Sequence, residues 1–321
     1  MSVVETEIRG QIMIVTLNRP ERMNALGVEL RKGMGEAFTE FRRSKSLEVA
    51  ILTGTGRAFC AGEDMKESLE RGKPGSEGHP VADPFRDGTL EKPVIAAVNG
   101  FAMGGGFMLV ERTDLRVAVK GTVFEVSEAK RWLLGGYNHG LYANLAHPVA
   151  TEMALGYRFT AERLHQLGFI NRLVDPDKLL PEAVGMAEHL LTLPPASRVN
   201  TVYMMRQMRP KVAPDLAALA AALHEHGDKT DLMESRKAFA EKRKPSFKGW
   251  LKPDDRYRMP TLASLSKRPK AKSAVKSKPK AKAAAKSRAK TAAKPKAKAK
   301  AKAKAKTAAR PKARAKAKRK R

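Results

Sequence analysis

The sequence has a single cysteine, no apolar run long enough to cross a membrane, and no acidic residue in its last segment. Cys60 alone cannot form an intramolecular disulfide or a cysteine metal cluster, and this usage fits a reducing compartment. The first residues, 1–7, lack the basic start and the apolar stretch of a signal peptide. We therefore expect a cytoplasmic protein with no membrane partner.

The segment without acidic residues is a basic tail. From Ser266 to Arg321 it has 26 lysines and arginines, so it carries most of the net charge of +30 and leaves only +4 for residues 1–265. Charge repulsion and prolines predict that this low-complexity tail is disordered when free. It resembles the Lys-, Ala- and Pro-rich tails of linker-histone-like bacterial proteins. Its charge favours binding of nucleic acid or another polyanion through residues 266–321, and hence association with the nucleoid; a solubilising extension is the alternative.

Apolar runs alternate with helical periodicity before the tail. Compact apolar runs, typical of buried strands, occupy residues 11–17, 48–53, 93–98 and 114–119. Between the first two runs, apolar residues at three- and four-residue steps predict an amphipathic helix whose other face, including Arg31, meets water. From about Leu180 onward the pattern is helical, over residues 180–191, 196–208 and 214–227. The alternation predicts an α/β fold, followed by a helical assembly region.

Two glycine-containing segments, 58–64 and 99–106, each follow a predicted strand and open a predicted helix. Their glycines would let a ligand touch the main chain. A main-chain N–H at the start of a helix has the helix dipole behind it, so two such groups converging on one carbonyl oxygen would stabilise an enolate. Ordinary tight turns are the alternative interpretation of either segment alone, and the pair favours an oxyanion hole.

In this order and spacing, these segments resemble the crotonase family, the enoyl-CoA hydratase and isomerase superfamily. The likeness runs from about Val4 to about Lys248 and is carried by four motifs, Thr16–Leu26, Gly62–Asp64, Pro93–Gly106 and Phe239–Lys248. It implies an α/β crotonase-like spiral of ββα turns, with a coenzyme A thioester as substrate and with no separate cofactor or metal. It also implies a spiral core over residues 1–190 and a helical oligomerisation region over 191–258 that builds a homotrimer or homohexamer, before the basic tail over 259–321.

The resemblance assigns roles residue by residue. The oxyanion donors would be the main-chain N–H groups of Glu63 and Gly105. Glu63 departs from the small residue usual in the family, and its side chain is expected to point to solvent. Glu128 would be the principal acid/base. Coenzyme A contacts are implied for Arg22, Met23, Ala25, Ala61, Phe247 and Lys248.

Two neighbours of these residues have structural interpretations. Asp64 is interpreted as a helix N-cap that satisfies main-chain amides. Cys60 is interpreted as a small packed residue rather than a nucleophile, because nothing near it in the sequence activates a thiol. Neither residue is therefore expected to take part in catalysis.

One family glutamate is missing, because Met108 stands at the first of the two positions that hydratases of the family use. A thioether neither orients water nor exchanges a proton. Glu111, Glu125 or His139 could replace the lost group, with structural pairing as the alternative for Glu111 and His139. Hydration and isomerisation of an enoyl-CoA, the acyl chain, and a trimer or a hexamer are all left open. The second hypothesis is a catalytically weak acyl-CoA-binding scaffold that the basic tail tethers to nucleic acid.

Overall fold

The structure is a computed structural model that describes residues 2–73, 81–131 and 134–266. These residues belong to one unit of the chain, Met1–Pro269. The predictions of disorder and polyanion binding for the basic tail fall outside the described residues, apart from Ser266 and the few residues before it. No helix in the described ranges is long and apolar enough to cross a membrane.

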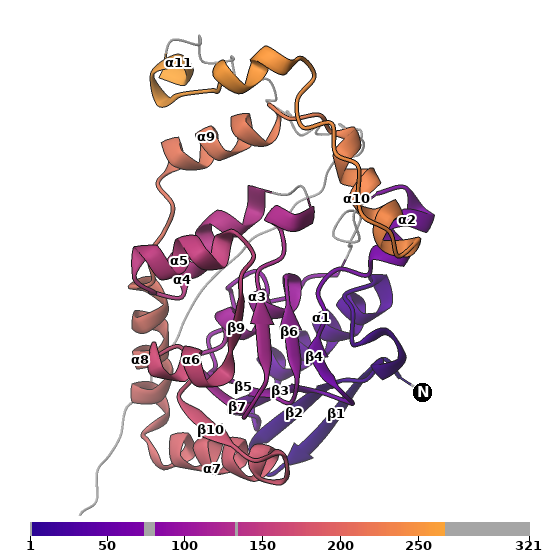
Figure 1. Ribbon diagram of the computed structural model, residues 1–321. Helices are drawn as coiled ribbons and strands as arrows, with labels where there is room; N and C mark the ends of the chain where they lie inside the picture. The colour runs from indigo at the N-terminus through magenta and orange to yellow at the C-terminus, as the bar shows by residue number, and fades with distance from the viewer. Residues whose placement is uncertain (1, 74–80, 132–133, 267–321) are drawn as a thin grey trace, which may run out of the picture. The chain divides into compact units, whose positions relative to one another are not determined.

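A six-stranded sheet carries the core of this unit (Figure 1). The sheet has the order β1-β2-β3-β5-β7-β10. β1 is antiparallel to β2, and the other neighbouring strands are parallel. The strands span Val4–Arg9 (β1), Ile12–Leu17 (β2), Val49–Gly54 (β3), Val94–Val98 (β5), Leu115–Val119 (β7) and Arg172–Val174 (β10). The four strands predicted from apolar runs are confirmed as β2, β3, β5 and β7.

Alternate side chains of this sheet pack against different layers. In β3, Val49 belongs to the core cluster that includes α7 (Leu179–Thr192), whereas Ala50 belongs to the cluster that includes α1 (Val28–Arg43). Because both faces of the sheet are covered around β2, β3 and β5, these strands consist largely of consecutive apolar residues, whereas the edge strand β1 is polar and mostly exposed. α1 buries one face, as its periodicity predicts, through Leu30, Met34, Ala37, Phe38 and Phe41.

A second sheet, with the order β4-β6-β8-β9, gives the chain its repeat. Its strands are β4 (Ala58–Cys60), β6 (Phe101–Met103), β8 (Val123–Glu125) and β9 (Arg158–Thr160). The pairs β3-β4, β5-β6 and β7-β8 are followed by α2 (Met65–Arg71), α3 (Gly105–Arg112) and the 3-10 turn η2 (Ala129–Arg131). These are the strand-strand-helix turns that the resemblance implies, and the predicted α/β class is confirmed.

The short strands β4 and β6 correct one prediction. The two glycine-containing segments do not pass directly from a long strand into a helix, because each begins with a strand of its own. A three-residue strand leaves no periodic pattern in the sequence. β4 and β6 pair in parallel, with Ala58 opposite Phe101 and Cys60 opposite Ala102. This pairing brings the two segments side by side.

Helices dominate the chain after β10. α7, α8 (Pro195–Gln207) and α9 (Pro214–His224) lie where the sequence predicts helices. α10 (Thr230–Ala240) was not predicted, and it packs against α2 (Figure 1).

The remaining helices are short and are spread along the described chain. They are η1 (Pro20–Arg22), η3 (Leu134–Asn138), α4 (His139–Tyr142), α5 (His147–Ala154), α6 (Ala161–Gln166), η4 (Pro176–Lys178), η5 (Pro253–Tyr257) and α11 (Leu262–Ser266).

Candidate active site

The glycine turns that follow β4 and β6 lie in contact. Gly62 has a φ of +86°, and a Cβ there would lie 2.7 Å from the Met103 carbonyl oxygen and 3.2 Å from the Gly105 nitrogen. Only glycine allows this backbone conformation at such a close approach. Gly105 is the first residue of α3, where a main-chain N–H has no partner within its own helix. The structure therefore places the two expected donor segments against each other.

Main-chain hydrogen bonds hold a third segment beside the first turn. The Leu26 N–H donates to the Gly62 carbonyl over 2.7 Å, and the Ala61 N–H donates to the Met23 carbonyl over 3.0 Å. Met23 adopts the left-handed conformation, with a φ of 54°. The segment expected to contact coenzyme A is thus fixed to the turn expected to contact the thioester.

Asp64 caps α2, as interpreted from the sequence. Its carboxylate accepts a hydrogen bond from the Glu67 N–H over 3.1 Å and another from the Arg19 guanidinium over 2.9 Å. The Arg22 guanidinium lies 3.8 Å from the same carboxylate. These partners engage the carboxylate in holding the helix start and leave it a structural role.

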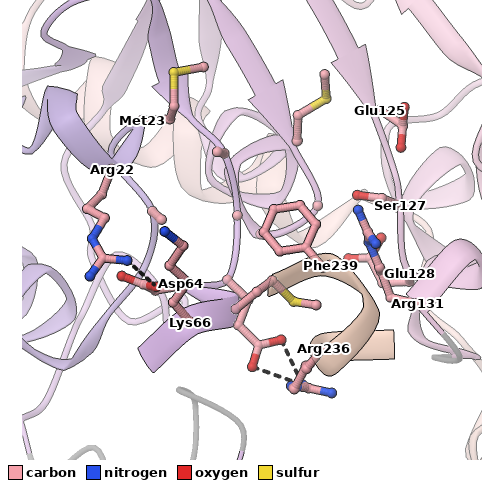
Figure 2. Close-up of a pocket in the computed structure, with 18 of the residues that line it drawn as sticks. Arg22, Met23, Asp64, Lys66, Glu125, Ser127, Glu128, Arg131, Arg236 and Phe239 are labelled. Atoms are coloured by element: carbon pink, nitrogen blue, oxygen red, sulfur yellow. Dashed lines mark hydrogen bonds and ion pairs between the residues drawn. The ribbon is translucent and has the colours of Figure 1, made fainter. Parts of the chain in front are cut away.

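A cavity of about 470 Å³, the outer cavity, opens over the two turns (Figure 2). The three residues predicted to carry the chemistry line it, as do four of the predicted coenzyme contacts: Glu63, Gly105, Glu128, Arg22, Met23, Ala25 and Ala61. Four cations that the sequence analysis did not single out also line it: Lys66, Arg131, Arg158 and Arg236. Among the described residues, Phe247 and Lys248 lie outside this lining, and the Lys248 Nζ is 3.8 Å from Asp228.

The Glu63 side chain is held by α10, which corrects the expectation that it points to solvent. Its two oxygens accept hydrogen bonds from Arg236 Nη2 over 2.9 and 2.8 Å, drawn as dashed lines at Arg236 in Figure 2. Ser68 Oγ donates to Glu63 as well. Arg236 is only 1% exposed. The family has a small residue at the position of Glu63. The acidic residue found there was therefore the signal in the sequence for a buried cation such as Arg236. The ion pair joins α10 to the first donor turn.

Replacing Arg236 by methionine is expected to destabilise the protein by about 3 kcal/mol, because Glu63 loses the cation that compensates its partly buried carboxylate. We expect a lower Tm and also a lower kcat, since the first donor turn loses its tie to α10. Arg243→Met is the matched control, because Arg243 pairs with Glu234 of α10 at the surface, where a pair contributes about 1 kcal/mol or less. Equal losses of Tm and kcat in the two variants would contradict this role.

Glu128 follows β8 and lies beside the second donor turn. Its Oε1 is 3.8 Å from the place that a Cβ on Gly104 would occupy, and its buried Oε2 has no hydrogen-bond partner among the described residues. Burial raises the pKa of Glu128, an effect that the charge of His139 partly offsets. A carboxylate with a raised pKa and a free oxygen is a stronger base than an exposed one.

Glu111 and His139 pair with each other rather than with the cavity. His139 Nδ1 lies 2.8 Å from Glu111 Oε2, and both side chains are buried. Neither belongs to the lining of the cavities that Glu128 lines in the described part of the chain. This pairing favours the structural alternative for both residues.

Glu125 lines the outer cavity but is ion-paired. Its carboxylate lies 3.0 Å from the Arg158 guanidinium and 3.3 Å from Lys130 Nζ. The Glu125 carboxylate is thus engaged with two cations, whereas Glu128 has an oxygen without a hydrogen-bond partner among the described residues. Met108 itself lines a cavity that Glu128 also lines. The position of the missing glutamate is therefore occupied by a side chain without a titratable group.

A second cavity of about 270 Å³, the inner cavity, shares Glu63, Gly105 and Glu128 with the outer one. Its walls come from α1, α3 and the chain before β5. The apolar part of the lining consists of Leu26, Met34, Met108 and Leu109, and the charged part of Arg31, Asp83, Arg86 and Arg112. Arg31 thereby departs from the expectation that it meets water. No local sequence pattern indicated the other three.

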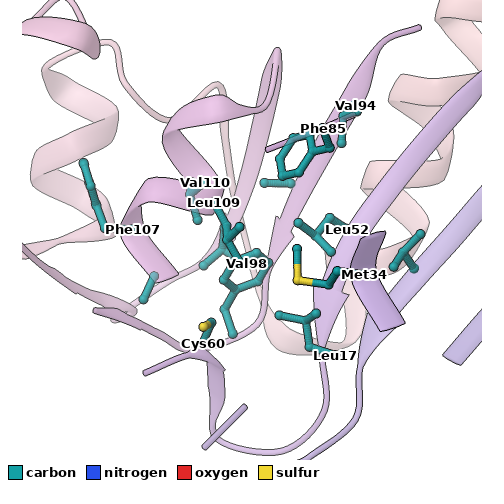
Figure 3. Packing of buried hydrophobic residues seen from close by; sticks show 14 of the residues in the cluster. Leu17, Met34, Leu52, Cys60, Phe85, Val94, Val98, Phe107, Leu109 and Val110 are labelled. Carbon is teal, nitrogen blue, oxygen red and sulfur yellow. The ribbon is translucent and has the colours of Figure 1, made fainter. Parts of the chain in front are cut away.

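Cys60 is packed in the core, as interpreted (Figure 3). It belongs to the same buried cluster as Phe107 and Leu109. Burial raises the pKa of its thiol to about 12. The thiolate, which is the nucleophilic form, is therefore scarce at neutral pH.

The strand-strand-helix spiral, with a site where two of its turns meet, defines an α/β protein of crotonase type. The enoyl-CoA hydratase/isomerase family model matches residues 7–250, and the chain belongs to this family. It is 33% identical to (E)-benzylidenesuccinyl-CoA hydratase of Thauera aromatica, over 77% of this chain and 99% of that protein. It is 34% identical to mevalonyl-coenzyme A hydratase of Aspergillus fumigatus, over 74% and 91%. It is 35% identical to carnitinyl-CoA dehydratase of Salmonella arizonae, over 75% and 96%.

Solved structures agree with this assignment. A carnitinyl-CoA hydratase from Mycobacterium avium superposes with a TM-score of 0.67 at 28% identity, covering 77% of this chain and 99% of that one. An enoyl-CoA hydratase from Mycobacterium tuberculosis superposes with a TM-score of 0.60 at 32% identity, covering 78% and 100%. The chain is thus an enzyme of the enoyl-CoA hydratase type, with the crotonase-like fold.

Proposed function

We propose that this enzyme adds water across the double bond of a 2-enoyl-CoA thioester, or removes water in the reverse direction. The observation that carries the proposal is the buried Glu128 carboxylate, with one oxygen free of hydrogen bonds among the described residues, next to the two donor turns. The similarity to two hydratases and a dehydratase supports it. These relatives are named as enzymes, so the similarity does not favour the alternative of a catalytically weak scaffold.

The two donor turns would stabilise the enolate that forms during addition. Water adds at the β-carbon, and the electrons of the double bond move onto the thioester oxygen. The main-chain N–H groups of Glu63 and Gly105 would donate to that oxygen, with the dipole of α3 behind the second donor. Loss of one such donor typically costs about 3 kcal/mol of transition-state stabilisation.

Glu128 would move the proton. Its carboxylate takes a proton from the water that attacks the β-carbon, and the resulting carboxylic acid returns that proton to the α-carbon of the enolate. One group can serve both steps because its raised pKa makes it a good base before the attack and lets it hold the proton afterwards. No second titratable group is needed at Met108.

The two cavities would hold the parts of the substrate that lie on either side of the thioester. With the carbonyl at the shared residues, coenzyme A would occupy the outer cavity and the acyl group the inner one. Arg22 and Lys66 would provide charge-assisted hydrogen bonds to the phosphates of the coenzyme. Contacts from Phe247 and Lys248, and a trimeric or hexameric assembly, stay predictions.

Isomerisation is the second candidate, and Met108 favours it. A single carboxylate can remove a proton from one carbon and return it to another without adding water. A product assay in oxygen-18 water with 2-enoyl-CoA and 3-enoyl-CoA thioesters separates the two reactions. We expect a 3-hydroxyacyl product that contains the label. A shifted double bond with no label would assign the enzyme as an isomerase, and no turnover of any thioester would contradict the proposed chemistry.

We propose that the basic tail binds nucleic acid independently of catalysis, because its charge can neutralise many phosphates. Deleting residues 266–321 is expected to abolish retention on DNA at low salt and to leave kcat unchanged. A tail of the same length with glutamine in place of lysine and arginine is the control for chain length, and it should also fail to bind. DNA retention by either variant at the level of the full chain would contradict the proposal.

A further inference from the structure

Three guanidinium groups line the inner cavity and come from three different parts of the fold. Arg31 belongs to α1, Arg86 to the chain before β5, and Arg112 to the last turn of α3. All three are partly buried. Among the described residues, none of them has a carboxylate within ion-pair distance. Arg31 Nε donates a hydrogen bond to the Leu26 carbonyl over 3.2 Å.

Three other buried or partly buried arginines among the described residues are compensated by carboxylates. Arg236 pairs with Glu63, Arg206 pairs with Asp114 at 2.6 Å, and Arg198 pairs with Glu48. A guanidinium removed from water needs such a partner, because burying an isolated charge is costly. The guanidinium groups of the inner cavity differ from these in lacking one within the part of the chain that the structure describes.

The acidic residues of the inner cavity do not balance this charge. Glu63 is engaged by Arg236, so that only Glu128 and Asp83 remain to face three guanidinium groups, and burial raises the pKa of both carboxyl groups. Asp83 Oδ1 accepts a hydrogen bond from the main-chain N–H of Arg86 over 3.0 Å. The lining therefore holds an excess of positive charge.

The three cations also act on one another. Burial lowers the pKa of Arg31 and of Arg112, and the charge of Arg86 acts on both in the same direction, while nearby carboxyl groups, Glu111 foremost for Arg112, partly offset the lowering. Like charges that share one partly buried cavity repel each other more strongly than they would in water. A bound anion would remove this repulsion and would satisfy guanidinium donors that face the cavity.

We propose that the acyl group of the substrate carries a carboxylate at the end remote from the thioester, and that Arg31, Arg86 and Arg112 bind this carboxylate. The inference rests on the proposed function, since it requires the thioester to lie between Glu63 and Gly105. Guanidinium groups match a carboxylate with paired, parallel hydrogen bonds. An acyl chain that ends in a methyl group would instead cover these cations without compensating them.

The chain between the two ends would cross the apolar part of the inner cavity. Met108 and Leu109 of α3 lie on that path. The thioether of Met108 thus has a role in this substrate class: it contacts methylene groups where a glutamate would add a negative charge near the substrate carboxylate. The substrate is a thioester of coenzyme A with one end of a dicarboxylic acid.

The test compares 2-enoyl-CoA thioesters of equal chain length that end in a carboxylate or in a methyl group. For the wild-type enzyme we expect kcat/KM to be about 30-fold higher for the carboxylate-ended substrate, since truncating one partner of a desolvated charge pair has an effect of that order or larger. Arg86→Met and Arg112→Met should each lose most of this preference. Arg43→Met, at an exposed position of α1 outside the cavity, is the control and should keep it.

A binding measurement separates failure of this inference from failure of the proposed function. Adipyl-CoA and hexanoyl-CoA are saturated, so calorimetry reports their affinity without turnover. Tighter binding of adipyl-CoA by the wild-type protein, lost in Arg86→Met and kept in Arg43→Met, supports the carboxylate site even if no enoyl-CoA is hydrated. Turnover of the carboxylate-ended and the methyl-ended substrates with equal kcat/KM, or equal affinity for the two saturated thioesters, would overturn the inference. Either result would leave the hydratase proposal unaffected.

Discussion

Glu128→Gln is expected to lower kcat on a 2-enoyl-CoA by about 10³-fold while leaving the protein no less stable than the wild type. The amide has the shape of the carboxyl group but neither accepts nor returns a proton. Burial already disfavours the charged carboxylate in the folded state. Replacing it removes that penalty, so we expect an unchanged or higher Tm at neutral pH.

The pH dependence of this stability difference follows from the raised pKa. The folded state binds the Glu128 proton more tightly than the unfolded state, so the wild type loses stability as the pH rises from the ordinary value of 4.5 through the folded pKa. The Tm advantage of Glu128→Gln should therefore be present above that window and absent below it. Thermal unfolding of the two proteins at acidic and neutral pH measures this difference.

The activity profile of the wild-type enzyme provides a second measurement of the same group. Because the ionised carboxylate is the base, kcat/KM should fall as the pH decreases through a pKa above 4.5. Glu125→Gln serves as the comparison, since Glu125 lines the outer cavity but is paired with Arg158. A loss of kcat in Glu125→Gln as large as in Glu128→Gln would contradict a single principal acid/base.

Gly62→Ala is expected to lower kcat by about 10²-fold or more, because it separates the two donor turns. The added Cβ would lie 2.7 Å from the Met103 carbonyl oxygen and 3.2 Å from the Gly105 nitrogen. Both neighbours are main-chain atoms, so relief requires the turns to move apart. Loss or misalignment of one donor removes its stabilisation of the transition state, and this contribution is usually among the largest in such reactions.

The control for Gly62→Ala is Gly121→Ala. Gly121 has a φ of +74°, similar to the +86° of Gly62, but no atom lies within 4 Å of a Cβ there. Alanine at either position carries the same kind of left-handed strain, on the order of 1 kcal/mol. Both variants should lose Tm, and only Gly62→Ala should lose kcat beyond that. Equal kcat values for the two variants would show that the contact between the turns is not needed.

The main strands could be predicted from the sequence because packing on both faces leaves an unbroken apolar run. β2, β3 and β5 follow this rule, and β7 follows it except at Arg116. β4 and β6 could not be predicted, because three residues show no periodicity and the pairing joins segments that are far apart in the chain. The approach of the two donor turns depends on that pairing, so the sequence indicated the segments and only the fold showed their contact.

The charged groups of the site could not be predicted from local patterns. Arg236 and Glu63 are 173 positions apart, and neither predicts the other. Arg31 was assigned to the water-facing side of α1, because a helical pattern shows only which residues share a face. The pattern does not show whether neighbouring elements form a cavity over that face. Arg86 and Arg112 join it only when α3 and the chain before β5 close the inner cavity. Asp64 was predictable, because an N-cap depends on its own helix alone.

The polarisation of the bound thioester carbonyl tests the central claim most directly. A 2-enoyl-CoA labelled with carbon-13 at that carbonyl can be bound to Glu128→Gln, which should not convert it. We predict a downfield shift of the carbonyl resonance on binding, kept when Gly121→Ala is added and lost when Gly62→Ala is added. A bound thioester whose resonance stays at its position in water would contradict an oxyanion site formed by the two turns.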